Sequence, residues 1–159
     1  MNRLRTAIRL LTLGTLLWSG HVYGYSCSVT ANPVSFGNYS PLGGSSLDAV
    51  GNVRVSCSLL GLTSLLVNYD IRLSTGSSGS YFPRRMYNGT YDLEYNLYTD
   101  SARTTIWGDG SGGTSYISDG YLLGLLTVSR DYPVYGHLPA GQNVPAGIYS
   151  DVIVVTVDY

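Results

Sequence analysis

Apolar and polar residues alternate through several stretches of the chain, a pattern typical of β-strands that bury one face. In residues 53–59, 65–73 and 91–97 every second residue is apolar or aromatic. These sets are Val53, Val55, Cys57 and Leu59; Leu65, Val67, Tyr69, Ile71 and Leu73; and Tyr91, Leu93, Tyr95 and Leu97. After residue 24, no apolar stripe with the 3.6-residue period of a helix runs for three turns. The pattern predicts sheets with one packed and one solvated face.

Turn-forming residues separate these stretches. Asn88-Gly89 can supply the positive φ angles of a tight hairpin turn. Pro133 is expected to interrupt a strand or to confine it to a sheet edge. Residues 148–159, IYSDVIVVTVDY, are predicted to form a final strand that runs to the last residue. Six or seven strands at this spacing predict a single all-β sandwich.

The first 24 residues have the three parts of a secretory signal. Arg3, Arg5 and Arg9 form a basic start, an apolar run covers residues 10–18, and Gly24 ends a segment suited to cleavage. The apolar run is too short to span a bilayer, which takes about 20 residues. We therefore expect residues 1–24 to be a cleaved signal and residues 25–159 to form one domain.

Charge excludes two classes of partner. The chain has nine arginines and no lysine, and six arginines remain against ten acidic residues once the signal is removed. The net charge of the expected mature chain is then −4. Because no basic stripe survives, the sequence argues against nucleic acid and against an anionic membrane as partners.

Two cysteines, Cys27 and Cys57, follow the signal. In an oxidising compartment a disulfide is the default for such a pair. Two free thiols or a shared metal are the alternatives, although neither cysteine has a CxxC partner or a nearby histidine. The predicted bridge would close a loop of about 30 residues and contribute about 3–4 kcal/mol.

The residues needed for catalysis are missing from the sequence. His137 is the one histidine left after the signal, it lies in a Gly- and Pro-flanked stretch typical of a loop, and no serine lies in a GxSxG elbow. Asp92 and Glu94 share one face of a predicted strand, where solvated positions explain them better than a glycosidase pair. Residues 108–113, GDGSGG, lack the spacing of a calcium loop. We predict no enzyme activity, no cofactor and no metal.

Residues 27–58, CSVTANPVSFGNYSPLGGSSLDAVGNVRVSCS, resemble the opening of the spore coat protein U domain. This domain is also the subunit domain of archaic, Csu-type chaperone–usher pili. The matching features are the two cysteines, a V-x-F-G-x-Y motif at residues 34–39 and a G-x-V-x-V-x-C strand that ends at Cys57. The end of the chain, PAGIYSDVIVVTVDY from Pro145, resembles the last strand of the family.

The resemblance implies an immunoglobulin-like β-sandwich that lacks its final strand and has one disulfide. The missing strand is supplied first by a periplasmic chaperone and then by a neighbouring pilus subunit at the outer-membrane usher, a form of β-augmentation. The last strand is the expected edge of the groove, and its candidate residues are Val152, Ile153, Val154, Val155, Val157 and Tyr159. The expected destination is the cell surface, as part of a pilus or coat, or the medium.

A donor strand of roughly ten alternating residues would have to precede Cys27. Cleavage after Gly24 leaves only Tyr25 and Ser26 before it. The chain is therefore predicted to accept a strand but not to give one, as a tip, adhesive or terminating subunit or as a non-polymerising coat protein. A secreted carbohydrate-binding sandwich, whose 14 tyrosines could contact a glycan, and a small outer-membrane β-barrel remain alternatives.

Overall fold

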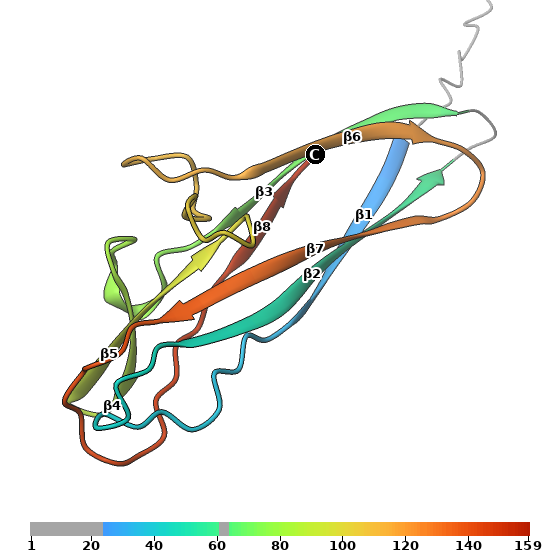
Figure 1. The fold of residues 1–159 in the computed structure, drawn as a ribbon. Helices are drawn as coiled ribbons and strands as arrows, with labels where there is room; N and C mark the ends of the chain where they lie inside the picture. Colours follow the sequence, from blue (N-terminus) through green and yellow to red (C-terminus); the bar gives the residue numbers. More distant parts are fainter. Residues whose placement is uncertain (1–23, 61–63) are drawn as a thin grey trace, which may run out of the picture.

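The computed structural model describes residues 24–60 and 64–159, which form two facing β-sheets (Figure 1). One sheet has five strands in the order β1-β2-β7-β5-β4, and the other has three in the order β6-β3-β8. The bounds are β1 Gly24–Asn32, β2 Leu47–Leu60, β3 Leu65–Leu73, β4 Arg84–Asn88, β5 Tyr91–Tyr98, β6 Ile117–Leu123, β7 Val128–Leu138 and β8 Val155–Asp158, with one short 3-10 turn, η1, at Gly76–Ser78. The all-β sandwich expected from the alternation is confirmed, with eight strands in the described residues where six or seven were predicted. None of the helical structure in these ranges is long and apolar enough to cross a membrane.

The predicted apolar faces meet between the two sheets. Side chains from β2, β3 and β5 supply most of the core, with contributions from β6, β7 and the loop that carries Trp107. The fully or nearly fully buried members are Val53, Val55, Cys57, Val67, Tyr69, Ile71, Leu73, Leu93, Tyr95, Leu97, Trp107, Leu123, Val134 and Leu138. Of the predicted inward residues Tyr91 alone is exposed, because it stands next to the hairpin turn at the end of β5.

The β4–β5 hairpin forms where the sequence predicted it, with a small difference in the turn. Asn88 pairs with Tyr91, so the two loop residues are Gly89 and Thr90 rather than Asn88 and Gly89. Gly89 has the positive φ, 60°, that the turn requires. The turn therefore lies one residue later in the chain than the Asn-Gly signal suggested.

Strand β7 bears out one of the two alternatives predicted for Pro133 and contradicts the prediction for His137. Pro133 lies inside this strand, opposite Asn52 of β2, and does not interrupt it. Among the described residues, β5 reaches β7 only at Tyr135–His137, so at Pro133 the far side of β7 is a local sheet edge, the second alternative, and the missing N–H costs no ladder bond. His137 also lies on this strand and not in the predicted loop. Its Nδ1 lies 2.7 Å from Asp48 Oδ1.

The final strand is also shorter than predicted. Regular pairing covers only Val155–Asp158, beside β3, whereas an isolated bridge joins Ser150 to Tyr87 of β4. Strands β4 and β3 belong to different sheets, so the segment crosses from one sheet to the other as it approaches the end of the chain. A continuous ladder over residues 148–159 is impossible for that reason.

A hydrogen-bonded cluster ties the two sheets together between β3, β6 and β7. The Tyr69 and Tyr132 hydroxyls lie 2.5 Å apart, and Tyr132 donates to Asp119 Oδ2 at 2.5 Å. Arg130 donates to both oxygens of Asp119 at 2.7 and 2.6 Å. Burial opposes ionisation of Asp119, but these hydrogen bonds outweigh it and hold the pKa of that carboxyl below its usual value.

Replacing Asp119 with asparagine is expected to lower the free energy of unfolding by about 1–3 kcal/mol, because Tyr132 and Arg130 lose their charged acceptor. A carboxyl with a depressed pKa stabilises the fold above its unfolded pKa, near 3.9, and loses that contribution as the pH falls through the folded value. The variant should therefore lose less stability than the wild type between about pH 5 and pH 2. Urea unfolding at several pH values measures both effects. Asp92→Asn, which removes an exposed partner of Arg85, is the control and should cost less than about 1 kcal/mol.

Candidate functional site: an open groove between two sheet edges

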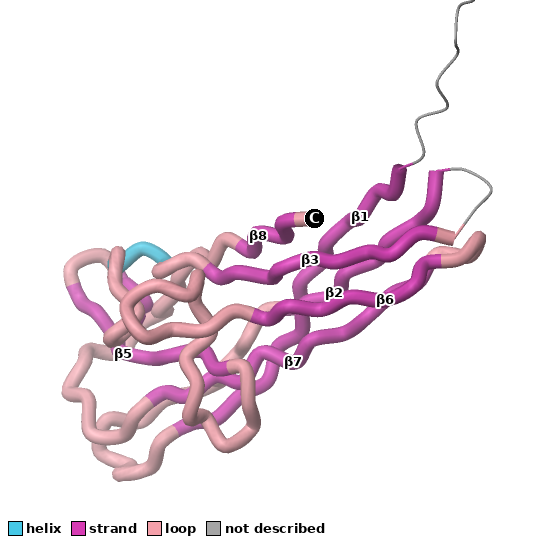
Figure 2. The backbone as a smooth tube through the Cα atoms, turned by 90° about the horizontal axis from the view of Figure 1, so that it is seen from above, coloured by secondary structure: helices cyan, strands magenta, loops and turns pink. Residues whose placement is uncertain are grey.

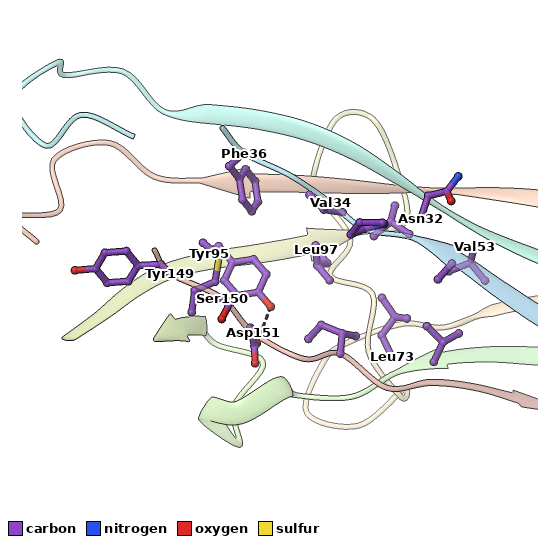
Figure 3. Close-up of a pocket in the computed structure, with 16 residues that line it drawn as sticks. Asn32, Val34, Phe36, Val53, Leu73, Tyr95, Leu97, Tyr149, Ser150 and Asp151 are labelled. Carbon is purple, nitrogen blue, oxygen red and sulfur yellow. Dashed lines mark hydrogen bonds between the residues drawn. The ribbon is translucent and has the colours of Figure 1, made fainter. Parts of the chain in front are cut away.

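A groove of about 420 Å³ opens between the two sheets on the side where β1 and β8 are the outermost strands (Figure 3). One wall is the chain that follows β1, with Val34 and Phe36 pointing inward, and the other is the segment that leads into β8. The floor is apolar and comes from five strands: Val53, Leu73, Met86, Tyr95, Leu97 and Val134. The sandwich is thus incompletely covered along one side, and core side chains line the opening.

The backbone of both walls is unpaired toward the groove. On one wall, Ser150 exchanges hydrogen bonds with Tyr87, and Val154 accepts one from Ser74. Tyr149, just before this pair of contacts, and Asp151 and Ile153, between them, have backbone N–H and C=O groups without a hydrogen-bond partner among the described residues. On the other wall, residues 33–39 make no backbone–backbone hydrogen bond within the same described part of the chain. Two unpaired edges that face an apolar floor are what an added β-strand needs.

At one end the groove continues into a second hollow. The groove shares Val34, Phe36, Met86 and Tyr149 with this hollow of about 590 Å³, which continues between two Gly- and Pro-rich loops, residues 37–41 and 144–147. In the opposite direction, beyond the last lining residues Ala31 and Val155, the ring centres of Tyr25 and Tyr159 lie 5.6 Å apart and link the start of β1 to the end of β8. In Figure 2 the C-terminal end of the chain lies beside β1.

One acidic residue interrupts the apolar row of the β8 wall. Asp151 Oδ2 accepts a hydrogen bond of 2.7 Å from the Tyr95 hydroxyl, and Asp151 Oδ1 accepts from the backbone N–H groups of Ser77 and Val152 (Figure 3). Burial, followed by this bond to Asp151, raises the pKa of Tyr95 well above its usual value, so the phenol stays protonated and donates. Asp151 therefore links this wall by hydrogen bonds to β5 and to η1, while the groove stays open beside it.

The six residues predicted for this edge divide by the side on which they lie. Ile153 and Val155 line the groove, and Val157 packs against the core beyond it. Val152 and Val154 point outward and are 74% and 59% exposed. The strand was expected to be buried on both faces, but no part of the described chain covers this outer face. Tyr159 is 58% exposed and contacts Tyr25.

Sequence reasoning missed the opposite wall and the acid. Val34 and Phe36 belong to the V-x-F-G-x-Y motif, but nothing in their spacing indicated that they face the last segment across a groove. Their signal was the alternation of Val34 and Phe36 with polar Ser35, which continues the inward row of β1. Asp151 could have been found in the same way, since it occupies an inward position between Tyr149 and Ile153.

The remaining candidates lie away from the groove and in ordinary structural roles. Asp92 and Glu94 both pair with Arg85 on the solvated side of β4 and β5, as predicted. No group of acidic, histidine and cysteine side chains suited to a metal occurs in residues 24–60 and 64–159. Cys27 and Cys57 form the disulfide that the fold prediction included, between directly paired residues of β1 and β2.

Comparison with known proteins gives three consistent matches. The family model of the Spore Coat Protein U domain matches residues 13–156. Protein U of Myxococcus xanthus is 33% identical over 148 residues, which cover 86% of this chain and 79% of that protein. A chain of a crystal structure from Acinetobacter baumannii superposes with a TM-score of 0.54 at 20% identity. That structure is described as the CsuC–CsuE chaperone–tip adhesion subunit pre-assembly complex of archaic chaperone–usher Csu pili. The match covers 85% of this chain but 40% of the other, and it supports the immunoglobulin-like sandwich fold.

Proposed function

The chain belongs to the Spore Coat Protein U domain family, and we propose that it is an exported, non-enzymatic subunit of a surface coat or chaperone–usher pilus. The observation that carries the proposal is the groove, which has an apolar floor and two unpaired edges. A strand from a periplasmic chaperone would fill it first, and a strand from another subunit would replace that one at an outer-membrane usher. The similar solved structure is itself a complex of a chaperone with a subunit, which supports a chaperone as the first partner.

We further propose that residues 1–24 are removed on export and that the product accepts a strand without donating one. Cleavage there would leave Tyr25 and Ser26 ahead of Cys27, and both already pair with β2 as part of β1. A chain so processed has nothing to insert into a neighbour and fits a tip or terminating position. Intact-mass measurement of the protein recovered from the cell surface tests this, since a mature start ten or more residues before Cys27 would restore a donor strand.

The groove is tested by expressing the protein in a bacterial periplasm with and without the chaperone encoded near its gene. We expect soluble, disulfide-bonded protein to accumulate only as a one-to-one complex with the chaperone. A soluble, monomeric and heat-stable product without any chaperone would mean that the sandwich is complete, and the proposed function would fail.

A matched pair of substitutions locates the binding surface. Ile153→Asp places a charge in the groove and is expected to reduce recovery of the chaperone complex at least tenfold, because the strand would have to bury an unpaired carboxylate. Val152→Asp changes the neighbouring residue, which is exposed and points outward, and should leave the complex intact. Pull-down of the tagged chaperone followed by quantitative immunoblotting measures both. Equal losses for the two variants would place the contact elsewhere.

A further inference from the structure

We propose, as an inference that rests on the proposed function, that Asp151 and the Tyr95 hydroxyl select the strand that fills the groove. The selected strand has a side chain that donates hydrogen bonds, preferably lysine, at one of its inward positions. Both residues line the groove, and Figure 3 shows them joined by a hydrogen bond beside its apolar floor. A strand that fills the groove must therefore cover one polar spot among apolar contacts.

The polar spot has acceptors with spare capacity and no free donor. The Tyr95 hydroxyl donates to Asp151 Oδ2 at 2.7 Å, and burial raises the pKa of Tyr95 well above its usual value, so this proton stays in place. Asp151 Oδ1 already accepts from the backbone N–H groups of Ser77 and Val152, both at 2.8 Å. A carboxylate accepts about four hydrogen bonds, and a phenolic oxygen accepts as well as donates. Asp151 Oδ2 and the Tyr95 oxygen therefore each keep a lone pair for a donor from outside.

The charge of Asp151 has no counter-ion in residues 24–60 and 64–159. None of the ion pairs formed there includes Asp151. Asp100 and Asp109 are also outside these pairs, but they lie in loops that do not line the groove. Asp151 is half-buried, and a strand laid over it would remove its remaining contact with solvent. Because a buried carboxylate is unfavourable unless a cation or further donors compensate it, the covering strand is expected to supply one.

Strand geometry confines this preference to a single position. Residues directly opposite each other in a β-ladder point to the same face, with Cβ atoms about 4.5–5.5 Å apart. The residue of the added strand opposite Asp151 therefore points inward beside the carboxylate. Its inward neighbours lie opposite Tyr149 and Ile153, where an apolar side chain fits. Lysine suits the position opposite Asp151, because its stem packs on the apolar floor while its ammonium reaches the acceptors.

The test uses capped seven-residue peptides with valine at positions one, three, five and seven and threonine between them, matched to the wall from Tyr149 to Val155. One valine at a time is replaced by lysine, methionine or glutamate, which have similar stems and differ in charge. The oxidised, exported protein is refolded from urea with an equimolar mixture of the three peptides for one position. Mass spectrometry then gives their ratio in the purified complex, once this ratio has become constant.

Two protein variants accompany the wild type. Asp151→Asn removes the charge with little change in shape. Asp158→Asn is the matched control, because Asp158 is an acidic residue of the same terminal segment that pairs with Arg72 and does not line the groove.

At one of the four positions, we expect the wild type to retain at least about tenfold more lysine than methionine peptide, and at least about tenfold more methionine than glutamate peptide. The lysine preference at that position should fall below about threefold in Asp151→Asn and persist in Asp158→Asn. Full preference in Asp151→Asn, or no lysine preference at any position, would overturn the proposal.

The wild type alone also decides the matter if Asp151→Asn does not refold. A lysine preference of equal size at all four positions would come from the net charge of −4 of the expected mature chain and not from Asp151, and it would contradict the proposal. If no peptide, the unsubstituted one included, increases the refolding yield of any protein, the groove is not a strand site and the proposed function itself fails.

Discussion

Replacing Arg84 with methionine is expected to lower the free energy of unfolding by about 4 kcal/mol, enough to leave most of the protein unfolded or degraded in the cell. Arg84 is completely buried, and its guanidinium donates to the backbone carbonyls of Ser74 and Trp107 and to Asn96 Oδ1. Burial lowers the pKa of this guanidinium, yet an arginine stays protonated at any ordinary pH. Methionine fills a similar space but leaves the Ser74 and Trp107 carbonyls without a donor, and Asn96 Oδ1 keeps only the hydrogen bond from the Leu97 N–H.

The side chains around Arg84 explain why the loss should be so large. Asn96 extends the hydrogen-bond network, because its Nδ2 donates to the Tyr81 carbonyl at 2.7 Å. The Arg84 Cζ also lies 4.8 Å from the centre of the Tyr81 ring. The Trp107 carbonyl that receives Arg84 belongs to a fully buried residue whose indole N–H donates to Ile71. One cation therefore joins β4 to β5, to the Trp107 loop and to Ser74, the residue after β3, beside the buried hydrogen bond from Trp107 to Ile71.

The neighbouring arginine provides the control. Arg85 is the next residue of β4, points to solvent and pairs with Asp92 and Glu94. Arg85→Met should cost less than about 1 kcal/mol, the range of exposed ion pairs. Chemical unfolding followed by tryptophan fluorescence distinguishes the variants, because Trp107 lies in the affected cluster. Arg84→Lys adds a further test, since lysine keeps the charge but cannot reach all three acceptors. Should Arg84→Met unfold at the same urea concentration as Arg85→Met, the buried network would be stabilising nothing.

How far the sequence predicts this fold depends on whether a feature is local. The faces of β2, β3 and β5 follow directly from alternation, because a strand repeats every two residues whatever its neighbours are. The hairpin at Gly89 follows from turn chemistry for the same reason. By contrast, the route of residues 148–154 from β4 to β3 depends on where two different sheets lie, and no property of that segment encodes it.

The alternation also contained information about the buried polar residues that a search for catalytic groups overlooked. Arg84 precedes Met86 on the same inward face of β4, and Asp151 stands between inward Tyr149 and Ile153. A charged residue at an inward position must either find partners or face an opening. Arg84 finds hydrogen-bond partners in the core. Asp151 finds a partner in Tyr95 and also faces the opening at the edge of the groove. The two positions where the simple pattern fails are therefore the ones that organise the core and the candidate site.

Removing the disulfide is expected to have an effect of similar size, about 3–4 kcal/mol, through a different mechanism. The bridge links Cys27 to Cys57 across a sequence separation of 30 residues, and opening it frees that loop in the unfolded chain. The double substitution Cys27→Ala, Cys57→Ala should melt about 10 °C lower than the oxidised wild type. Reducing the wild type with dithiothreitol should produce most of the same shift, and dithiothreitol should not change the double variant.

The position of the bridge predicts a second consequence, which separates its role at the groove from its role in stability. Among the residues that the structure describes, strand β1 pairs only with β2, and the disulfide links the two strands covalently near the middle of their ladder, Cys27 opposite Cys57. The groove wall of Pro33–Phe36 is the direct continuation of β1. Loosening β1 should therefore weaken strand binding beyond the loss expected for a uniformly destabilised domain.

The Asp119→Asn variant is the comparison, because the hydrogen bonds that it loses join β3, β6 and β7 on the far side of the sandwich. At a temperature where both variants are still folded, a capped seven-residue peptide of alternating valine and threonine, matched to the wall from Tyr149 to Val155, should dissociate at least tenfold faster from the disulfide variant than from Asp119→Asn. Equal dissociation rates would show that the bridge stabilises the domain as a whole and does not shape the groove.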